Sequence, residues 1–136
     1  MFADGGARGN PGPAASGAVL YELDSKGQVG EKVAEVGKYL GEATNNQAEY
    51  QAIILGLLKA KEMNFDSVDA YLDSELAVKQ LNGEYRVKNE ELAKLFLQIH
   101  NLKQKFHSTQ FSHVPRERNK EADAVVNKTI DEALGL

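Results

Sequence analysis

Four acidic residues occur at or near the ends of apolar segments of the chain: Asp4, Glu49, Asp73 and Asp123. A short apolar start leads straight into Asp4, and an alternating strand pattern ends on Asp73. Glu49 opens one long apolar helix and Asp123 opens another. Carboxylates that converge repel one another and raise one another's pKa, and a bound cation is the usual way to keep them ionised together. The pattern therefore predicts a site for a hard metal ion.

The donor types in the chain favour Mg²⁺ or Mn²⁺ at this site. The sequence contains no Cys and no pair of His at ligand spacing, so the oxygen-rich set does not suit zinc. Two such ions about 4 Å apart can activate water and stabilise a leaving alkoxide in phosphodiester cleavage. Metal-dependent phosphodiester cleavage is therefore one chemistry that such a site could support.

Each carboxylate also has a structural explanation when it is taken alone. Glu49 and Asp123 would be acids in a first helical turn, Asp73 a residue of a strand-to-helix turn, and Asp4 a turn former. Jointly the four are harder to explain in this way. Asp4 and Asp73 follow apolar strand residues and would be partly buried without a cation.

Other classes of enzyme fit the sequence less well. A glycosidase needs two carboxylates and a sugar platform that usually contains aromatics, yet the chain has no Trp. A phosphatase with a nucleophilic Asp4 commonly has a second Asp two residues later, where this chain has Gly6. The glycine-rich segment from Gly5 to Gly12 matches neither the P-loop nor the dinucleotide-binding fingerprint.

The elements that must position the carboxylates alternate between strand and helix patterns. Strands are predicted at the start of the chain and over 15–23, 28–40, 67–73 and 109–114, and helices over 47–63, 75–81, 89–106 and from about 122. The order β-β-β-α-β-α-α-β-α requires a sheet that mixes an antiparallel meander with parallel strands reached through helical crossovers. Ligands collect at the carboxyl ends of the parallel strands of such sheets, where Asp4 and Asp73 are expected.

Length and composition place the chain among ordinary globular proteins. Its 136 residues, 42% of them hydrophobic, predict a single domain over 1–136. No apolar run approaches the roughly 20 residues of a membrane span and no signal peptide is visible, so we expect a cytoplasmic protein without membrane contact. The net charge of −4 argues against a large basic surface for nucleic acid, so any such contact should be local.

Four segments together resemble the motifs of type 1 ribonuclease H, in the right order and over nearly the whole chain: DGGARGNPGP from Asp4, TNNQAE from Thr44, LDS from Leu72 and NKEAD from Asn119. The resemblance implies an α/β fold, a five-stranded mixed sheet flanked by helices. It also implies hydrolysis of the RNA strand of an RNA/DNA hybrid with two Mg²⁺ or Mn²⁺ ions. The metal-binding catalytic carboxylates would then be these residues: Asp4, Glu49, Asp73 and Asp123.

The resemblance also implies residues that bind the hybrid. Asn10, Asn45 and Asn46 would contact the minor groove, where 2′-hydroxyls distinguish RNA, and Thr44 would help to hold a DNA phosphate. Asn and Thr suit these roles because neutral donors and acceptors can bond hydroxyls and base edges. Turn and helix-cap chemistry would explain the segment from Thr44 to Asn46 equally well.

Three departures from the family pattern modify these expectations. The segment from Gly83 to Lys88 leaves no room for the basic protrusion of some relatives, so substrate affinity should be modest. Many relatives have a mobile His before the last carboxylate, whereas here Arg118, with Arg116 as a second candidate, would supply positive charge, and His113 would be a packed strand residue. Only three residues precede Asp4, which is consistent with a trimmed chain or a part of a longer protein.

Taken together, these patterns predict a monomeric, metal-dependent endoribonuclease whose partner is an RNA/DNA hybrid. One alternative is a nuclease on the same fold that also cuts double-stranded RNA. The other is a hybrid-binding module without catalysis, against which the presence of all four carboxylates argues.

Overall fold

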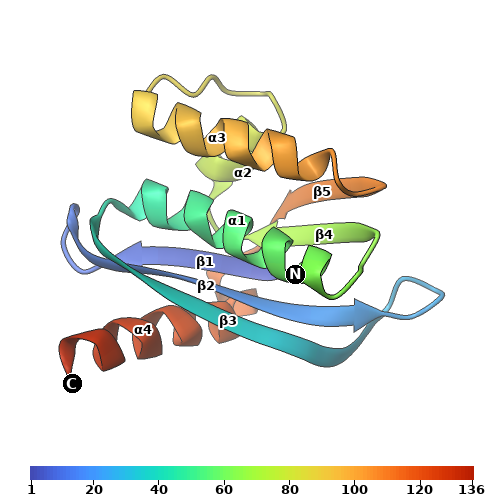
Figure 1. Cartoon of the computed structure of the whole chain (residues 1–136), viewed down its shortest axis with the longest axis horizontal. Helices are drawn as coiled ribbons and strands as arrows, with labels where there is room; N and C mark the ends of the chain where they lie inside the picture. The colour runs from blue at the N-terminus through green and yellow to red at the C-terminus, as the bar shows by residue number, and fades with distance from the viewer.

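The chain folds around one five-stranded mixed sheet with helices on both faces (Figure 1). A computed structural model describes all residues, 1–136. In chain order the elements are β1 (Phe2–Ala7), β2 (Gly12–Leu23), β3 (Val29–Ala43), α1 (Asn45–Glu62), β4 (Ser67–Leu72), α2 (Glu75–Leu81), α3 (Glu90–Lys103), β5 (Ser108–His113), the 3₁₀ turn η1 (Arg116–Arg118) and α4 (Lys120–Leu134). The order of elements and the five-stranded mixed sheet predicted from the sequence are confirmed.

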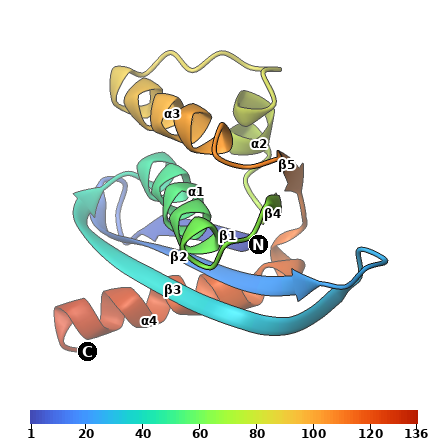
Figure 2. The same ribbon diagram turned by 45° about the vertical axis from the view of Figure 1, so that its right-hand side comes forward.

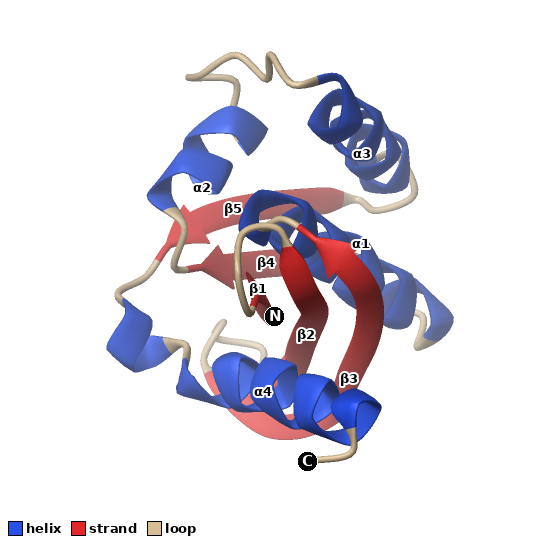
Figure 3. Cartoon of the chain, turned by 90° about the vertical axis from the view of Figure 1, so that its left-hand side faces the viewer, coloured by secondary structure: helices blue, strands red, loops and turns tan.

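The strands lie in the order β3-β2-β1-β4-β5. β1, β2 and β3 form the antiparallel meander, while β4 pairs parallel to β1 and β5 parallel to β4. Helix α1 packs on one face, with α3 against α1 and α2 beside them over β5, and α4 lies alone across the opposite face (Figures 1 and 3). The turned view shows the strong curvature of β2 and β3 around α1 (Figure 2). None of these helices has the length and apolar character that crossing a membrane requires.

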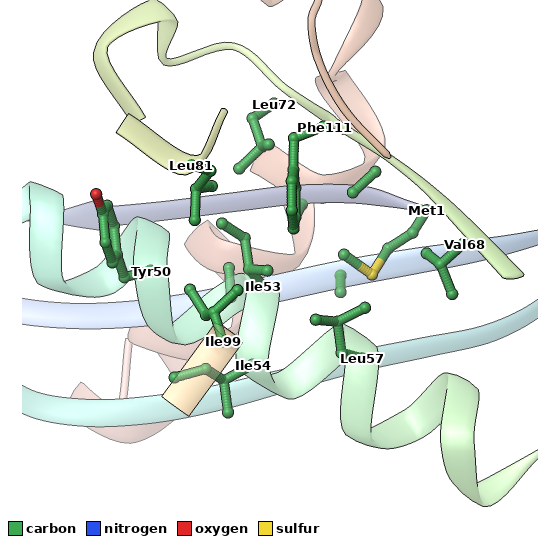
Figure 4. Packing of buried hydrophobic residues seen from close by; sticks show 14 of the residues in the cluster. Met1, Tyr50, Ile53, Ile54, Leu57, Val68, Leu72, Leu81, Ile99 and Phe111 are labelled. Carbon is green, nitrogen blue, oxygen red and sulfur yellow. The ribbon is translucent and has the colours of Figure 1, made fainter. Parts of the chain in front are cut away.

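The main core lies between α1 and the sheet. Tyr50, Ile53 and Leu57 recur at three- and four-residue steps along α1 and are fully buried, and Leu72 of β4 and Ile99 of α3 join them (Figure 4). A capping box starts the helix at Thr44, as described below. The core on this face forms one cluster of 21 buried residues.

The opposite face has much less apolar packing. Val126 and Ile130 of α4 form a cluster of 3 buried residues with Ala15. Val125, with Ala122, forms another cluster of 3 against Val19 of β2. Helix α4 is therefore attached through two small apolar contacts rather than through a continuous core.

Two predicted boundaries were wrong near the site. β1 does not end on Asp4 but runs on to Ala7, because the backbone of the glycine-rich segment continues to pair with β2. α1 begins at Asn45, so Glu49 lies beyond its first turn rather than opening the helix. The reason is that Thr44 caps the helix directly, as its side chain predicted it could.

Candidate active site

Two neighbouring parallel strands bring Asp4 and Asp73 to the same level of the sheet. Phe2 of β1 is in register with Tyr71 of β4, so the residues two positions further along each strand lie side by side. Asp73 directly follows the last residue of β4, and Ser74 then caps α2 by accepting a hydrogen bond from the Ala77 amide at 3.2 Å. The parallel pairing of β1 with β4 is thus the reason that these two carboxylates meet.

Glu49 reaches the same point because α1 approaches the sheet unusually closely. A Cβ on Gly5 would lie 2.1 Å from the carbonyl carbon of Ala48, so no residue with a side chain fits there without moving the helix. The Ser16 hydroxyl of β2 donates to the Ala48 carbonyl at 2.6 Å. These two contacts fix this turn of α1, and carboxylate oxygens of Asp4, Glu49 and Asp73 all lie within 4.8 Å of one another.

Asp123 joins the group from the opposite face of the sheet. It lies in the first turn of α4, as the sequence predicted, and its charge is close enough to Asp4 to raise the pKa of that carboxyl. The start of α4 is held by Asn119, which is 1% exposed and donates through Nδ2 to the Ala3 carbonyl of β1 at 2.9 Å. The structure therefore gathers all four predicted carboxylates, three from the sheet and α1 and one from α4.

The carboxylates are unfavourable in their ionised forms without a cation. Burial, followed by repulsion from Asp73, Asp123 and Glu49, raises the pKa of Asp4 to about 8. Burial also raises the pKa of Glu49 to about 7; the hydrogen bond from Ser74 opposes this rise and repulsion from Asp73 adds to it. One carboxylate oxygen, Glu49 Oε2, is buried without any hydrogen-bond partner. Acidic oxygens in this state fit a divalent cation, which would supply the missing positive charge.

The carboxylates open into a cavity of about 300 Å³ with a polar lining. Besides the four acids, its charged or amide-bearing lining residues are Arg8, Asn45, Arg116 and Asn127. A larger, mostly apolar cavity of about 380 Å³ lies at the other end of β1, around Phe2, Tyr21 and Tyr71, and contains none of the four carboxylates. The four predicted carboxylates therefore all line the smaller cavity.

Comparison with known proteins supports the same assignment. The family model described as "Reverse transcriptase-like" matches residues 2–129. The chain is 42% identical over 132 residues to Ribonuclease HI of Halobacterium salinarum, a match that covers 97% of this chain and 64% of that protein. The chain belongs to the ribonuclease H family. A crystal structure of LC11-RNase H1 in complex with an RNA/DNA hybrid has a TM-score of 0.87 and 42% identity, and the match covers 98% of this chain and 96% of that one.

Some members of the ribonuclease H family are considerably longer than this chain. The chain is 40% identical over 131 residues to a bifunctional protein of Mycobacterium tuberculosis. That match covers 96% of this chain but only 35% of the relative, so the chain spans about a third of the relative's length.

The family's usual loop histidine is replaced here by a segment with two arginines. Arg116 lines the acidic cavity, and its positive charge opposes the rise in the Glu49 pKa. Arg118, the residue favoured from the sequence, lies instead at a neighbouring pocket beside Phe2 and Tyr21. The turn η1 directs the two side chains to different places, so of these two arginines Arg116 is the one close to the carboxylates.

His113 is not the packed residue that the sequence predicted. It is the last residue of β5, and its side chain is exposed rather than buried. It is also absent from the lining of the acidic cavity. The acid that it lies near is Glu75 at the start of α2, whose pKa is lowered mainly by Lys79 and slightly by His113. The prediction of a structural packing role was wrong: strand alternation places His113 on the same face as the buried Phe111, but it is the last residue of the edge strand β5 and stays exposed.

The residues expected to contact a hybrid in the ribonuclease H family form one connected loop structure. Thr44 Oγ1 accepts from the Gln47 amide at 3.1 Å, and Gln47 Oε1 accepts from the Thr44 amide at 2.9 Å. Asn45 Oδ1 accepts from the Ala7 amide at 2.8 Å, and Asn10 Oδ1 accepts from the Asn45 amide at 3.0 Å. The cap chemistry considered for Thr44 is therefore present, while the amide NH₂ groups of Asn10 and Asn45 form no hydrogen bond within the chain.

Asn46 differs from its neighbours because its side chain is exposed and forms no hydrogen bond within the chain. Sequence reasoning missed three residues that shape the site, namely Gly5, Ser16 and Asn119. Their signals were present but weak, because a Gly after an Asp, a Ser in a strand and an Asn before a helix each have ordinary explanations.

Proposed function

We propose that the chain is a metal-dependent endoribonuclease that hydrolyses the RNA strand of RNA/DNA hybrids, and that it acts as a monomer. The observation that carries the proposal is the convergence of four carboxylates on one cavity, with the buried Glu49 Oε2 left without a partner. The hybrid bound in the LC11-RNase H1 crystal structure, from a protein 42% identical to this chain, supports the choice of substrate.

Asp4, Glu49, Asp73 and Asp123 would hold two Mg²⁺ or Mn²⁺ ions. All four donors are hard carboxylate oxygens, which these cations prefer, and binding would relieve the repulsion that raises the pKa of Asp4. The bound ions would supply activation of water and stabilisation of the leaving oxygen. The protein's own contribution is to hold the carboxylates in place through Gly5, Ser16 and Asn119.

Arg116 is the residue of the loop that we assign to the developing charge of the scissile phosphate. It lines the cavity close enough to Glu49 to influence its pKa, and an Arg remains charged over the whole working pH range. Arg116→Ala should therefore lower kcat more than it raises KM, whereas Arg118→Ala should have the smaller effect on kcat. The reverse order of effects would return the role to Arg118.

The decisive experiment compares wild type with Asp73→Asn on labelled RNA/DNA hybrid, double-stranded RNA and double-stranded DNA, with and without Mg²⁺. Asp73→Asn removes one charge at nearly constant shape, so we expect loss of at least about 100-fold in cleavage while hybrid binding survives better. Unchanged cleavage at saturating Mg²⁺ would remove Asp73 from the mechanism. Hybrid binding by the wild type without any cleavage would make the chain a binding module, and cleavage of double-stranded RNA would broaden its substrate class.

Discrimination between substrates tests the proposed groove contacts of Asn10, Asn45 and Asn46. Asn46→Ala is the cleanest variant, because this exposed side chain supports no contact within the chain. Asn45→Ala also removes the acceptor of the Ala7 amide, so Asn45→Asp, which keeps that acceptor but loses the NH₂ donor, is its matched control. We expect both Asn46→Ala and Asn45→Asp to reduce preference for hybrid without changing the Mg²⁺ requirement. Equal losses on all duplexes, or a changed Mg²⁺ requirement, would contradict the assignment.

A phosphate contact by Thr44 can be separated from its helix cap in the same way. Thr44→Ser keeps the hydroxyl that accepts from the Gln47 amide, whereas Thr44→Ala removes it. If the hydroxyl serves only as a cap, Thr44→Ala should lower the Tm and leave KM for the hybrid unchanged. The proposed phosphate contact requires KM to rise as well.

A further inference from the structure

Asp123 is the least constrained of the four carboxylates. Asp4 is 8% exposed and Glu49 and Asp73 are half-buried, but Asp123 is exposed and belongs to the weakly packed helix α4. An exposed Asp side chain on a helix has several accessible rotamers, so its oxygens are not fixed by packing. Something else must hold this carboxylate if it is to bind the same metal ions as Asp4, Glu49 and Asp73.

One turn later, Asn127 makes contact with Asp123. Asn127 Nδ2 lies 3.2 Å from the Asp123 carbonyl oxygen and 3.4 Å from Asp123 Oδ2. Its amide thus reaches both the backbone and the carboxylate of the same residue. Asn127 lines the acidic cavity together with Asp123, on the same edge of α4.

The other end of the Asn127 side chain is held from the β1–β2 loop by Arg8. Arg8 Nη2 lies 3.4 Å from the Asn127 carbonyl oxygen and 3.5 Å from Asn127 Oδ1. Arg8 Nη1 forms a salt bridge of 2.7 Å with Asp131, one turn further along α4. Because a guanidinium only donates and an amide NH₂ group cannot accept, this contact orients the Asn127 amide so that its Oδ1 faces Arg8 and its Nδ2 faces Asp123.

The glycine-rich loop fixes the backbone of Arg8. The Arg8 amide donates to the Pro13 carbonyl at 2.8 Å, and a Cβ on Gly12 would lie 2.1 Å from the Arg8 carbonyl oxygen. Gly9 adopts a φ of +96°, which residues with side chains rarely reach. The loop is therefore closed tightly enough to present the guanidinium to α4 from a defined direction.

We propose that Asn127 is a positioning residue for the Asp123 carboxylate, and that Arg8, anchored on Asp131, holds Asn127 in the orientation that this requires. The chain of contacts joins the β1–β2 loop to the one catalytic carboxylate that comes from α4. The inference rests on the proposed function, in which Asp123 is a metal ligand. It assigns to Arg8 a role within the protein, because its guanidinium is already engaged by Asp131 and Asn127.

The test measures metal binding as well as cleavage. In Asn127→Ala, we expect the affinity for Mn²⁺, measured by calorimetry without substrate, and the Mg²⁺ concentration for half-maximal cleavage both to worsen about tenfold. This is the lower end of the range for residues that orient metal ligands. Cleavage at saturating Mg²⁺ should recover most of the wild-type kcat. Lys128→Ala, at the exposed neighbouring position on α4, is the matched control and should leave both quantities unchanged.

Two further variants separate positioning from charge. Arg8→Lys keeps the positive charge but loses the fork that reaches Asp131 and Asn127 together, so it should weaken Mn²⁺ binding in the same direction as Asn127→Ala. Because Arg8 acts through Asn127, the variant carrying both Arg8→Lys and Asn127→Ala should be no worse than Asn127→Ala alone. Asp131→Asn, which removes the anchor at nearly constant shape, should resemble Arg8→Lys and replaces it if that variant fails to fold.

Three results would overturn the inference. Asn127→Ala could lower the Tm with no change in Mn²⁺ affinity, which would make Asn127 a helix residue only. Arg8→Lys could raise KM for the hybrid with metal binding intact, which would make Arg8 a substrate contact. If the losses of Mn²⁺ affinity in Arg8→Lys and Asn127→Ala simply add in the double variant, Arg8 does not act through Asn127. If the wild type binds Mn²⁺ in an Asn127-dependent way but cleaves no hybrid, the proposed function fails while the positioning role stands.

Discussion

The two faces of the sheet differ in the amount of apolar packing between sheet and helix, and the candidate active site takes residues from both. On the α1 face, a cluster of 21 buried residues packs the helix, and a glycine and a serine fix the turn that presents Glu49. On the α4 face, two clusters of 3 residues and a few polar contacts hold the helix that presents Asp123. Glu49 thus comes from the helix of the well-packed face and Asp123 from the helix of the sparsely packed face, while Asp4 and Asp73 come from β1 and the end of β4 between them.

This difference separates what the fold secures by apolar burial from what it secures by hydrogen bonds. Apolar burial is not directional, so it can place α1 firmly without depending on any single contact. Hydrogen bonds such as Asn119 to Ala3, and Asn127 to Asp123, are directional and each can be lost through one substitution. Changes on the α1 face should therefore act mainly on global stability, and changes on the α4 face mainly on the site.

The largest effect should come from pH and divalent cations acting on the two most perturbed carboxylates, Asp4 and Glu49. Folding raises the pKa of Asp4 to about 8 and that of Glu49 to about 7. In the unfolded chain both lie near their ordinary values of about 4. The neutral forms are thus favoured in the folded state, and the stability they contribute is present below about pH 4 and is lost as pH rises to about 8.

We therefore expect the free energy of unfolding in EDTA, measured with denaturant, to fall between about pH 5 and about pH 8. Saturating Mg²⁺ should remove most of this fall, because it binds only the folded site and favours the ionised carboxylates. Asp4→Asn should flatten the dependence in EDTA and weaken the response to Mg²⁺. A pH dependence that is the same with and without Mg²⁺ would show that these carboxylates do not bind it.

A matched pair of isoleucines compares the two faces directly. Ile53 of α1 is 0% exposed and Ile130 of α4 is 1% exposed, but they belong to the large and to a small cluster. Ile53→Ala should lower the free energy of unfolding by about 3–5 kcal/mol and Ile130→Ala by about 2 kcal/mol, because a sparsely packed site relaxes more easily around the cavity. Denaturant unfolding of both variants gives these values.

At a temperature where both variants remain folded, Ile130→Ala should lose more cleavage activity than Ile53→Ala. Its position against the acidic cavity gives the reason, since loosening α4 moves Asp123. Equal stability losses accompanied by equal activity losses would mean that the two faces are not distinct in the way described.

Asn119→Ala should have an intermediate effect. It leaves the Ala3 carbonyl of β1 buried without its donor, which should cost about 1–3 kcal/mol of stability. Lys120→Ala, at the exposed first position of α4, serves as the control and should change the Tm little. Hydrogen exchange measured by mass spectrometry should show faster opening of α4 in Asn119→Ala, with α1 unchanged. Uniform acceleration over both helices would indicate a global effect instead.

The smallest effect should be that of His113→Ala. Its side chain is exposed and lies outside the acidic cavity, so stability should change by no more than about 0.5 kcal/mol. The pH–rate profile of the variant should match that of the wild type, because no imidazole lines the cavity. A lost acidic limb in that profile would assign a proton-transfer role to His113.

Most of the fold could be predicted from the sequence because its elements are strongly patterned. Local sequence patterns agree with the final structure in several elements. These patterns are the alternation over β4, the apolar stripes of α1 and α3, and the capping residue Thr44. The extent of β1 could not be predicted, because a glycine-rich segment is typical of a turn unless the strand that pairs with it is known. The pairing of this segment with β2 depends on residues that follow in the chain and on the close approach of Ala48.

The site could be predicted in its residue types but not in all its connections. The carboxylates stood out because charges at the ends of apolar segments require an explanation. The choice between Arg116 and Arg118 depended on the direction of a short 3₁₀ turn, which no periodicity encodes. Contacts over long separations, such as Arg8 with Asn127 at 119 positions, likewise have no local sequence signal.

The attachment of α4 to β1 also has a consequence for the order in which the protein matures. Asn119 meets Ala3 across 116 positions, so this link closes only after nearly all of these residues have left the ribosome. Domains generally begin to fold from the N-terminal side during synthesis, and here the sheet and α1 precede α4 in the chain. A nascent chain that ends before Lys120 holds three of the four carboxylates, so we expect ribosome-stalled chains of that length to be inactive on hybrid. Activity on hybrid would thus begin only after α4 has emerged and brought Asp123 to the other three carboxylates.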